Sequence, residues 1–174
     1  MGIFIETKEI GPEGLAVDRW IETLQPLPVE GGEVVKVGRT HLTGDLSREP
    51  GRLAFTGDIG TVAILACSRC LEEYSVPLDL HFDLIYTTAP EGPMRKESRV
   101  EEESITLTHY NGLRVDLEAL LREQIYLGLP LKPLCRPDCH GLCPRCGTNL
   151  NHGTCGCPKE RKDDPRFLAL KKLL

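Results

Sequence analysis

Residues 74–87 read YSVPLDLHFDLIYT, the clearest alternation of apolar and polar side chains in the chain. One set of alternate positions is apolar or aromatic: Tyr74, Val76, Leu78, Leu80, Phe82, Leu84 and Tyr86. The other set is mostly polar: Ser75, Asp79, His81, Asp83 and Thr87. Because successive side chains of a strand point to opposite faces, this pattern predicts a long β-strand with one face on a core and one in solvent. Pro77 predicts an edge or a bulge near its start.

The segment before this strand predicts its partner. Residues 61–67 read TVAILAC, which is apolar at nearly every position, as in a strand covered on both faces. The sequence CSRC (67–70) lies between the two strands, so an antiparallel hairpin would carry Cys67 and Cys70 at its tip. Residues 14–24, GLAVDRWIETL, fit either an amphipathic helix or an extended segment. Two further stretches are short, β-rich and bounded by glycine or proline: EVVKVGRTHL (33–42) and GRLAFTG (51–57).

Downstream of residue 87 the pattern changes to loop and helix. Residues 88–103 have the composition of a solvated acidic loop, and SITLTHY (104–110) resumes a strand. Asn111-Gly112 predicts a type I′ hairpin turn after this strand. A helix follows, with Asp116 as its N-cap and an apolar stripe at helical spacing: Leu117, Leu120, Leu121 and Ile125. Gly128 and Pro130 end this helix.

The C-terminal residues predict a second helix and carry a basic charge. Asp164 and Pro165 form a helix start, followed by the apolar residues Phe167, Leu168, Leu170, Leu173 and Leu174. Residues 132–174 hold nine lysines and arginines against four acidic residues, a charge of +5 in a protein of −5. The first 131 residues are therefore acidic, at −10. This asymmetry does not indicate an RNA-binding surface of a single sign.

Eight cysteines are arranged as four close pairs. The N-terminus lacks the features of a secretory signal or transit peptide, and no apolar run is long enough to cross a bilayer, so we expect a cytoplasmic protein with no membrane partner. A reducing compartment favours metal ligation over disulfides for paired thiols.

The last four cysteines have the spacing of a zinc knuckle. In CPRCG (143–147) a turn brings two thiols together, and CGC (155–157) supplies two more within a short distance. The sequence therefore predicts a four-sulfur zinc site from Cys143, Cys146, Cys155 and Cys157. Structural thiols without metal are the alternative. Since four sulfur ligands leave no open position for water, such a site would stabilise the fold rather than catalyse a reaction.

The remaining cysteines form a second candidate site that would join the strand hairpin to the segment after the helix: Cys67, Cys70, Cys135 and Cys139. Sequence alone leaves open whether these two pairs meet, so one or two zinc ions are expected. Swapped pairings, or replacement of a cysteine by His140 or His152, are alternatives. No phosphate-binding glycine loop, HExxH or Gly-x-Ser-x-Gly motif is present, and we expect neither enzymatic activity nor a small-molecule substrate.

Several segments together resemble the YceD family, the large-subunit ribosomal RNA accumulation proteins, over about residues 30–174. They are CSRCLEEYSVPLDLHF, an acidic loop, VDLEALLREQIYLGLPLKPLC, CHGLCPRCGTNLN, CGC and DDPRFLALKKL. The resemblance implies a bacterial cytosolic factor that supports 23S ribosomal RNA accumulation or processing. It supplies no catalytic residue. Its implied partner is a ribosomal RNA precursor or a large-subunit ribosomal protein.

The basic tail is the candidate contact for such a partner. Its cations are Arg136, Arg145, Lys159, Arg161, Lys162 and Arg166, with Lys171 and Lys172 near the end. With few aromatic residues there, any RNA contact would be directed at phosphates and sensitive to salt. The acidic body could instead hold a basic ribosomal protein. A redox-sensing zinc protein or chaperone is the alternative function, because CPRC and CGC resemble the ligand pairs of redox-switched chaperones.

The sequence thus predicts an α+β protein in two parts. Residues 1–131 would form an acidic core domain, an antiparallel and partly closed sheet covered by one helix. Residues 132–174 would form a cysteine-rich module held by zinc, with the C-terminal helix.

Overall fold

The computed structural model describes residues 3–22, 27–28, 34–88 and 106–158. These residues form mostly strand, with one α-helix, α1 (Leu117–Gly128), and a short 3₁₀-helix, η1 (Thr7–Glu9). The strands are β1 (Phe4–Glu6), β2 (Leu15–Ile21), β3 (Leu27–Pro28), β4 (Val34–Val37), β5 (Thr40–Glu49), β6 (Arg52–Ala66), β7 (Glu73–Thr88), β8 (Thr106–Tyr110) and β9 (Arg114–Asp116).

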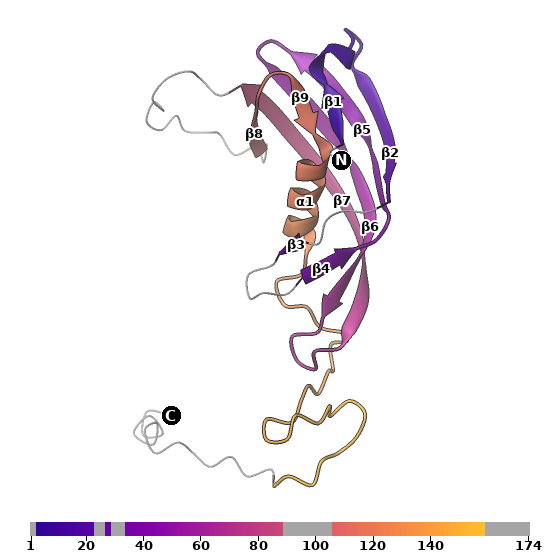
Figure 1. Ribbon diagram of the computed structural model, residues 1–174, viewed down its shortest axis with the longest axis vertical. Coiled ribbons are helices and arrows are strands. Elements are labelled where there is room, and N and C mark those ends of the chain that lie inside the picture. Colours follow the sequence, from indigo (N-terminus) through magenta and orange to yellow (C-terminus); the bar gives the residue numbers. More distant parts are fainter. Residues whose placement is uncertain (1–2, 23–26, 29–33, 89–105, 159–174) are drawn as a thin grey trace, which may run out of the picture.

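The main sheet is open and curved, and α1 lies against one of its faces (Figure 1). Strand β2 pairs with β5, β5 with β6, and β6 with β7, all antiparallel, while β4 extends the β5 side of β6 and pairs with β3. Strand β8 adds to β7 in parallel. The predicted antiparallel sheet with one covering helix is therefore confirmed except for the parallel β7–β8 pair, but the sheet is open and not partly closed in the described residues. Residues 89–105 separate β7 from β8, and so long a connection permits the parallel pairing that a tight turn forbids.

The hairpin of β6 and β7 is confirmed. Its pairing runs from Arg52 opposite Thr87 to Ala66 opposite Glu73, so CSRC stands at the tip. The predicted core face of β7 is buried or half-buried along its length, and its polar face is largely exposed. Strand β6 differs from the prediction that both of its faces are covered. Its buried residues alternate with exposed ones, and Val62 is 44% exposed.

The predicted helix is confirmed with its cap and its buried stripe. The Asp116 carboxylate accepts a hydrogen bond from the Ala119 amide at 3.1 Å, which satisfies one of the free amides of the first turn. All four residues of the predicted stripe are buried against the sheet: Leu117, Leu120, Leu121 and Ile125. Between helix and sheet, Phe55 and Phe82 pack edge to face at 5.1 Å. The core therefore lies between α1 and the concave face of the sheet.

The predicted hairpin at Asn111-Gly112 is wrong. A turn does form there, because the Asn111 side chain accepts hydrogen bonds from the amides of Leu113 and Arg114 and Gly112 has φ 78°. The strands on either side diverge, however. Strand β8 pairs with β7, whereas β9 pairs with β1 to form a separate two-stranded sheet.

Residues 14–24, for which the sequence left two alternatives, form strand β2 from Leu15 to Ile21. The predicted acidic loop and C-terminal helix lie outside the described residues, apart from Thr88 at the end of β7. No helix among the described residues is long and apolar enough to span a membrane.

Candidate metal centres

The eight cysteines lie in two groups of four. Within each group the sulfur atoms are all within 4.8 Å of one another: Cys67, Cys70, Cys135 and Cys139 in the first, and Cys143, Cys146, Cys155 and Cys157 in the second. These are the two sets that the sequence predicts, and no pairs are swapped. In the first group Cys67 and Cys139 are 3.7 Å apart at sulfur, as are Cys70 and Cys135. Since a disulfide requires about 2.05 Å, these sulfurs are not bonded to each other.

The first group forms because the chain after α1 runs back to the tip of the β6–β7 hairpin (Figure 1). Backbone hydrogen bonds fasten the two segments: the Ser68 amide donates to the Pro133 carbonyl at 2.9 Å, and the Leu142 amide donates to the Arg69 carbonyl at 3.1 Å. The Arg69 guanidinium adds a 2.8 Å hydrogen bond to the Cys139 carbonyl. Three of the four cysteines are almost fully buried in a small cluster of their own.

The second group is built on a tight turn. The Gly147 amide donates to the Cys143 carbonyl at 2.9 Å, and the Cys143 amide donates to the Thr148 carbonyl at 2.8 Å. Gly147 has φ 73°, a conformation that glycine adopts without the penalty of a side chain. Cys143 is buried, whereas Cys146 is exposed and the other two are intermediate. The second group is thus the more open of the two.

Hydrogen-bond donors lower the pKa of some thiols in each group. Burial raises the pKa of Cys67, but backbone amides donating to its sulfur outweigh this effect and lower the pKa to about 6. The Asn151 amide, 3.3 Å from the Cys139 sulfur, lowers the pKa of that thiol. In the second group the Thr148 side chain lowers the pKa of Cys146 to about 6, and the neighbouring Cys146 raises that of Cys157 to about 12. Each group therefore contains thiols that ionise easily.

Residues outside the sulfur groups connect them to each other. Asn151 accepts hydrogen bonds from the His140 amide and the Arg136 guanidinium while its own amide reaches Cys139. His152 contacts Glu72 at 2.6 Å, which joins the second group's segment to the hairpin. Asn151 and Glu72 were not predicted as site residues, and their only sequence signal is their nearness to cysteines. His152 and the exposed His140 belong to neither sulfur group.

Gly141 lies between the two groups and approaches the hairpin tip closely. It has φ 72°, and a Cβ at this position would lie 3.0 Å from the Arg69 carbonyl oxygen. The chain can therefore leave the first group at Cys139 and enter the second at Cys143 with its backbone against the hairpin.

Two of the six predicted partner-contact cations lie in the described part of the chain. Arg136 and Arg145 are both exposed on the cysteine-rich segment, and Arg136 also pairs with Asp138 at 3.5 Å. The others, Lys159, Arg161, Lys162 and Arg166, lie outside the described residues.

The geometry defines a class of protein: an open-sheet protein in which the tip of the longest hairpin and the cysteine-rich segment share one four-cysteine group, and that segment holds a second, both able to hold metal ions. The profile of the family "Large ribosomal RNA subunit accumulation protein YceD" matches residues 55–174, which include both groups. The chain belongs to this family.

Proteins of plants and of mycobacteria are similar to this chain. A chloroplastic large ribosomal RNA subunit accumulation protein YCED homolog 1 of Arabidopsis thaliana is 25% identical over 140 residues, covering 68% of this chain and 44% of that protein. The homolog of the same name from Zea mays is 28% identical, with 65% of this chain and 46% of the relative covered. An uncharacterised protein of Mycobacterium tuberculosis is 28% identical over 121 residues, with 68% and 54% covered. The chain thus spans about half the length of these relatives, and no solved structure matches it.

Proposed function

We propose that the protein is a non-enzymatic factor that supports accumulation or processing of 23S ribosomal RNA and assembly of the large ribosomal subunit. The observation that carries the proposal is the family match over residues 55–174, together with relatives named for large-subunit ribosomal RNA accumulation. Its place of action is the cytoplasm, a reducing compartment suited to eight unpaired thiols. Its partner is a ribosomal RNA precursor or a large-subunit ribosomal protein.

The two cysteine groups are proposed as structural zinc sites. In a tetrahedral zinc site with bonds of about 2.3 Å, sulfur atoms lie about 3.8 Å apart. The two sulfur distances of 3.7 Å in the first group agree with this spacing. Four thiolates fill the coordination sphere, so the ion would have no position at which to activate water. The cysteine-rich half of residues 132–174 lacks the large apolar side chains of a core. Zinc would then hold residues 132–174 to the acidic core domain of residues 1–131.

The basic residues of the cysteine-rich segment are the proposed partner contacts. Arg136 lies between Cys135 and Cys139 in the sequence and Arg145 between Cys143 and Cys146, and both are exposed. Further cations follow from Lys159 to Arg166. Cations with this spacing suit RNA phosphates or acidic protein surfaces, and the contact would weaken as salt rises.

Deletion of the gene tests the proposal. We expect a loss of mature 23S RNA and of large subunits in the deletion strain, measured by RNA blots and sucrose-gradient profiles. Restoration by the wild-type gene, but not by a Cys67→Ser/Cys139→Ser variant, would support the structural role of the first centre. Normal 23S RNA and normal subunit profiles in the deletion strain would refute the proposal.

One observation favours a redox-sensing zinc protein as the second candidate. Cys146 is exposed, and hydrogen bonds lower its pKa to about 6, so its thiolate is open to oxidants. Mild peroxide would then release zinc from the second group and expose the segment around it. Zinc that stays bound under mild peroxide would rule this function out.

A further inference from the structure

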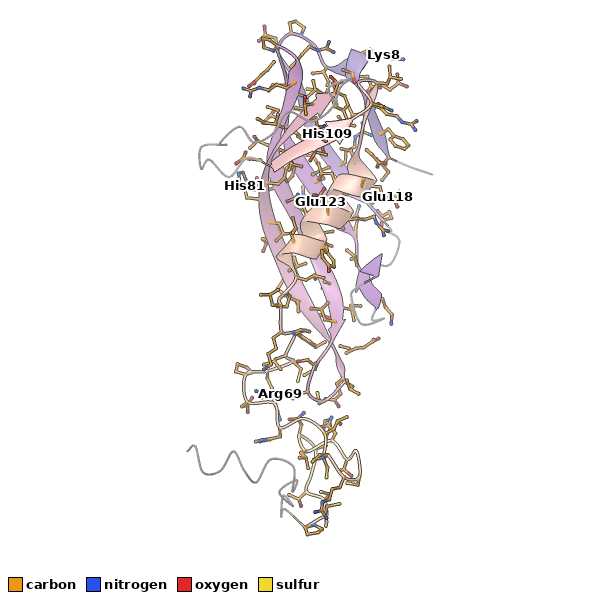
Figure 2. The ribbon with its side chains drawn as sticks, turned by 90° about the vertical axis from the view of Figure 1, so that its left-hand side faces the viewer. Lys8, Arg69, His81, His109, Glu118 and Glu123 are labelled. Atoms are coloured by element: carbon orange, nitrogen blue, oxygen red, sulfur yellow. The ribbon has the colours of Figure 1, made fainter. Side chains whose placement is uncertain are left out.

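Two pockets that share a wall lie at the end of the sheet opposite the cysteine groups. Figure 2 shows Lys8, His109 and Glu123 toward this end and Arg69 at the cysteine end. The first pocket, of about 300 Å³, lies between β8 and α1. The second, of about 690 Å³, lies beside η1. Asn111 and Arg114 line both pockets.

The first pocket is aromatic. Phe4, Tyr86 and Tyr110 line it, with the two tyrosine rings edge to face at 6.0 Å. The Arg114 guanidinium lies over the Phe4 ring, 4.1 Å from its centroid. Aromatic rings and a planar guanidinium are the surfaces on which unpaired nucleobases stack in proteins that bind single-stranded nucleic acid.

Tyr86 places a hydroxyl at the first pocket. The residue lines the pocket and is 4% exposed, and no buried side-chain nitrogen or oxygen among the described residues lacks a hydrogen-bond partner. Burial, with the nearby carboxylates of Glu123 and Asp116, raises the pKa of Tyr86, so the hydroxyl stays protonated and can donate. A ligand with an acceptor atom in the pocket would accept a hydrogen bond from it.

The second pocket supplies positive charge. Lys8, Arg48 and Arg114 line it, against one acidic residue, Glu6, which pairs with Lys8. One guanidinium nitrogen of Arg48 donates to the Thr7 carbonyl at 2.6 Å, which fixes its position at the pocket wall. An anionic group therefore fits here, next to the aromatic pocket.

We propose that the two pockets together bind one nucleotide of single-stranded RNA, with the base among the aromatic rings and the phosphate in the basic pocket. The Tyr86 hydroxyl would donate to an acceptor on the base. Glu123 and Asp116 would accept from an exocyclic amino group, which adenine and cytosine carry and uracil lacks. The site therefore prefers amino-bearing bases. This inference deepens the proposed ribosomal RNA function, on which its biological role rests.

A basic peptide could also bind to the carboxylates and aromatic rings of the first pocket. The three cations of the second pocket disfavour it, since they repel the flanking positive charges of such a peptide. The combination of an aromatic pocket and a basic one thus favours RNA.

Binding of fluorescein-labelled single-stranded RNA octamers, A8, C8 and U8, to the full zinc-loaded protein tests the inference by fluorescence polarisation. We expect A8 and C8 to bind more tightly than U8. Tyr86→Phe keeps the ring and removes only the hydroxyl, and should weaken A8 binding roughly 2- to 10-fold. Tyr110→Leu should weaken it roughly 5- to 100-fold through lost stacking. Arg114→Gln should lower the slope of log affinity against log salt by about 0.7.

Glu123→Gln should reduce the preference for A8 over U8 without abolishing binding. Lys36→Gln is the matched control, because Lys36 lies on β4 outside both pockets and its loss should change nothing. Equal affinity of wild type, Tyr86→Phe and Tyr110→Leu, or no binding of any octamer, would overturn the inference. So would tighter binding of a lysine- and arginine-rich peptide that depends on Tyr110. If the RNA-binding inference fails but a deletion strain still loses 23S RNA, the proposed function stands and only this binding site is refuted.

Discussion

The sulfur atoms of Cys67 and Cys139 lie 3.7 Å apart although 72 positions separate these residues in the sequence. The contact closes a loop that includes β7, β8, β9 and α1. A metal ion bound between the two residues would therefore fix the cysteine-rich segment to the hairpin that carries the sheet's longest strands.

Metal content is the first prediction from this arrangement. The protein purified under reducing conditions should contain two zinc ions per chain, one for each four-cysteine group, measured by elemental analysis. Cys67→Ser should lower the content to one ion. A wild-type content of one would restrict the metal to a single group, and no zinc with all thiols reduced would contradict the structural role of both.

The two groups should differ in how much of the chain they hold. Cys139→Ser should expose residues from Cys135 to Pro158 to protease, because the first group anchors the whole segment to the hairpin tip. Cys155→Ser should expose only the stretch after Cys143, since the backbone hydrogen bonds from Leu142 to Arg69 and from Ser68 to Pro133 remain. Limited proteolysis with mass spectrometry gives the cleavage sites. Identical cleavage maps for the two variants would contradict this order.

Local patterns predicted the hairpin and the helix well. The alternation from Tyr74 to Tyr86 reflects burial on one face of a strand, and the Asp116 cap and leucine stripe depend only on neighbours within a few turns. Both are properties of short segments, so the sequence contains them. The same holds for the turn that brings Cys143 and Cys146 together.

Local sequence patterns do not show which distant strands pair with each other. The alternation in β8 does not say whether it pairs with β7 or folds back on β9, and the Asn111-Gly112 turn is compatible with both. Val62 shows a similar limit, since an apolar residue on an exposed sheet face looks in the sequence like a core residue. The hydrogen bond from Asn151 to Cys139 depends on the folded segment as a whole.

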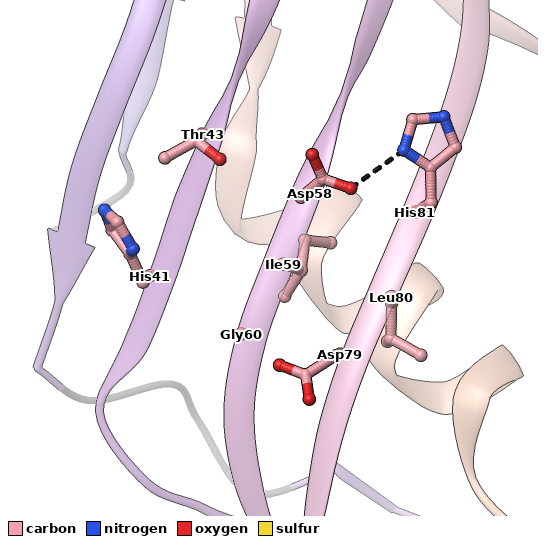
Figure 3. A pocket seen from close by; sticks show the side chains of 8 residues that line it. All are labelled: His41, Thr43, Asp58, Ile59, Gly60, Asp79, Leu80 and His81. Carbon is pink, nitrogen blue, oxygen red and sulfur yellow. Dashed lines mark hydrogen bonds and ion pairs between the residues drawn. The ribbon is translucent and has the colours of Figure 1, made fainter.

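The exposed face of the sheet supports a prediction on pH. Figure 3 shows His81 Nδ1 hydrogen-bonded to the Asp58 carboxylate, a contact of 2.8 Å. This hydrogen bond is the main cause that raises the pKa of His81 above 6.5, and Asp83 adds to it. Because the folded pKa is the higher one, the pair stabilises the fold fully below the unfolded pKa, and its contribution is lost as pH rises through the folded pKa.

An NMR titration of the histidine ring signals measures this shift. Asp58→Asn should lower the pKa of His81 toward its ordinary value. Asp79→Asn is the matched control, because Asp79 lines, with Asp58 and His81, the pocket drawn in Figure 3 but has no ion pair with His81 among the described residues. An unchanged His81 titration in Asp58→Asn would show that the hydrogen bond does not set the pKa.

The last prediction compares alanine substitutions at Gly57 and Gly60, two glycines of β6. Gly57 lies opposite Gly44 in the register of β5 and β6, and a Cβ on Gly57 would stand 2.2 Å from the Thr43 carbonyl oxygen and 2.9 Å from the Gly44 Cα. The backbones approach too closely for any side chain, and both atoms belong to a paired strand that cannot move alone. Gly57→Ala should therefore destabilise the protein by about 1–3 kcal/mol or more.

Gly60, three residues along β6, provides the control. A Cβ there would meet only the Asp79 carboxylate, at an ordinary 3.7 Å. Gly60→Ala should leave stability unchanged or raise it by up to about 1 kcal/mol, because alanine loses less backbone freedom on folding. Urea unfolding of the two variants, purified under the same reducing conditions, compares their stabilities. Equal midpoints would mean that β5 and β6 can separate at Gly44 and Gly57, and that the close approach does not help to hold the sheet in its curved form.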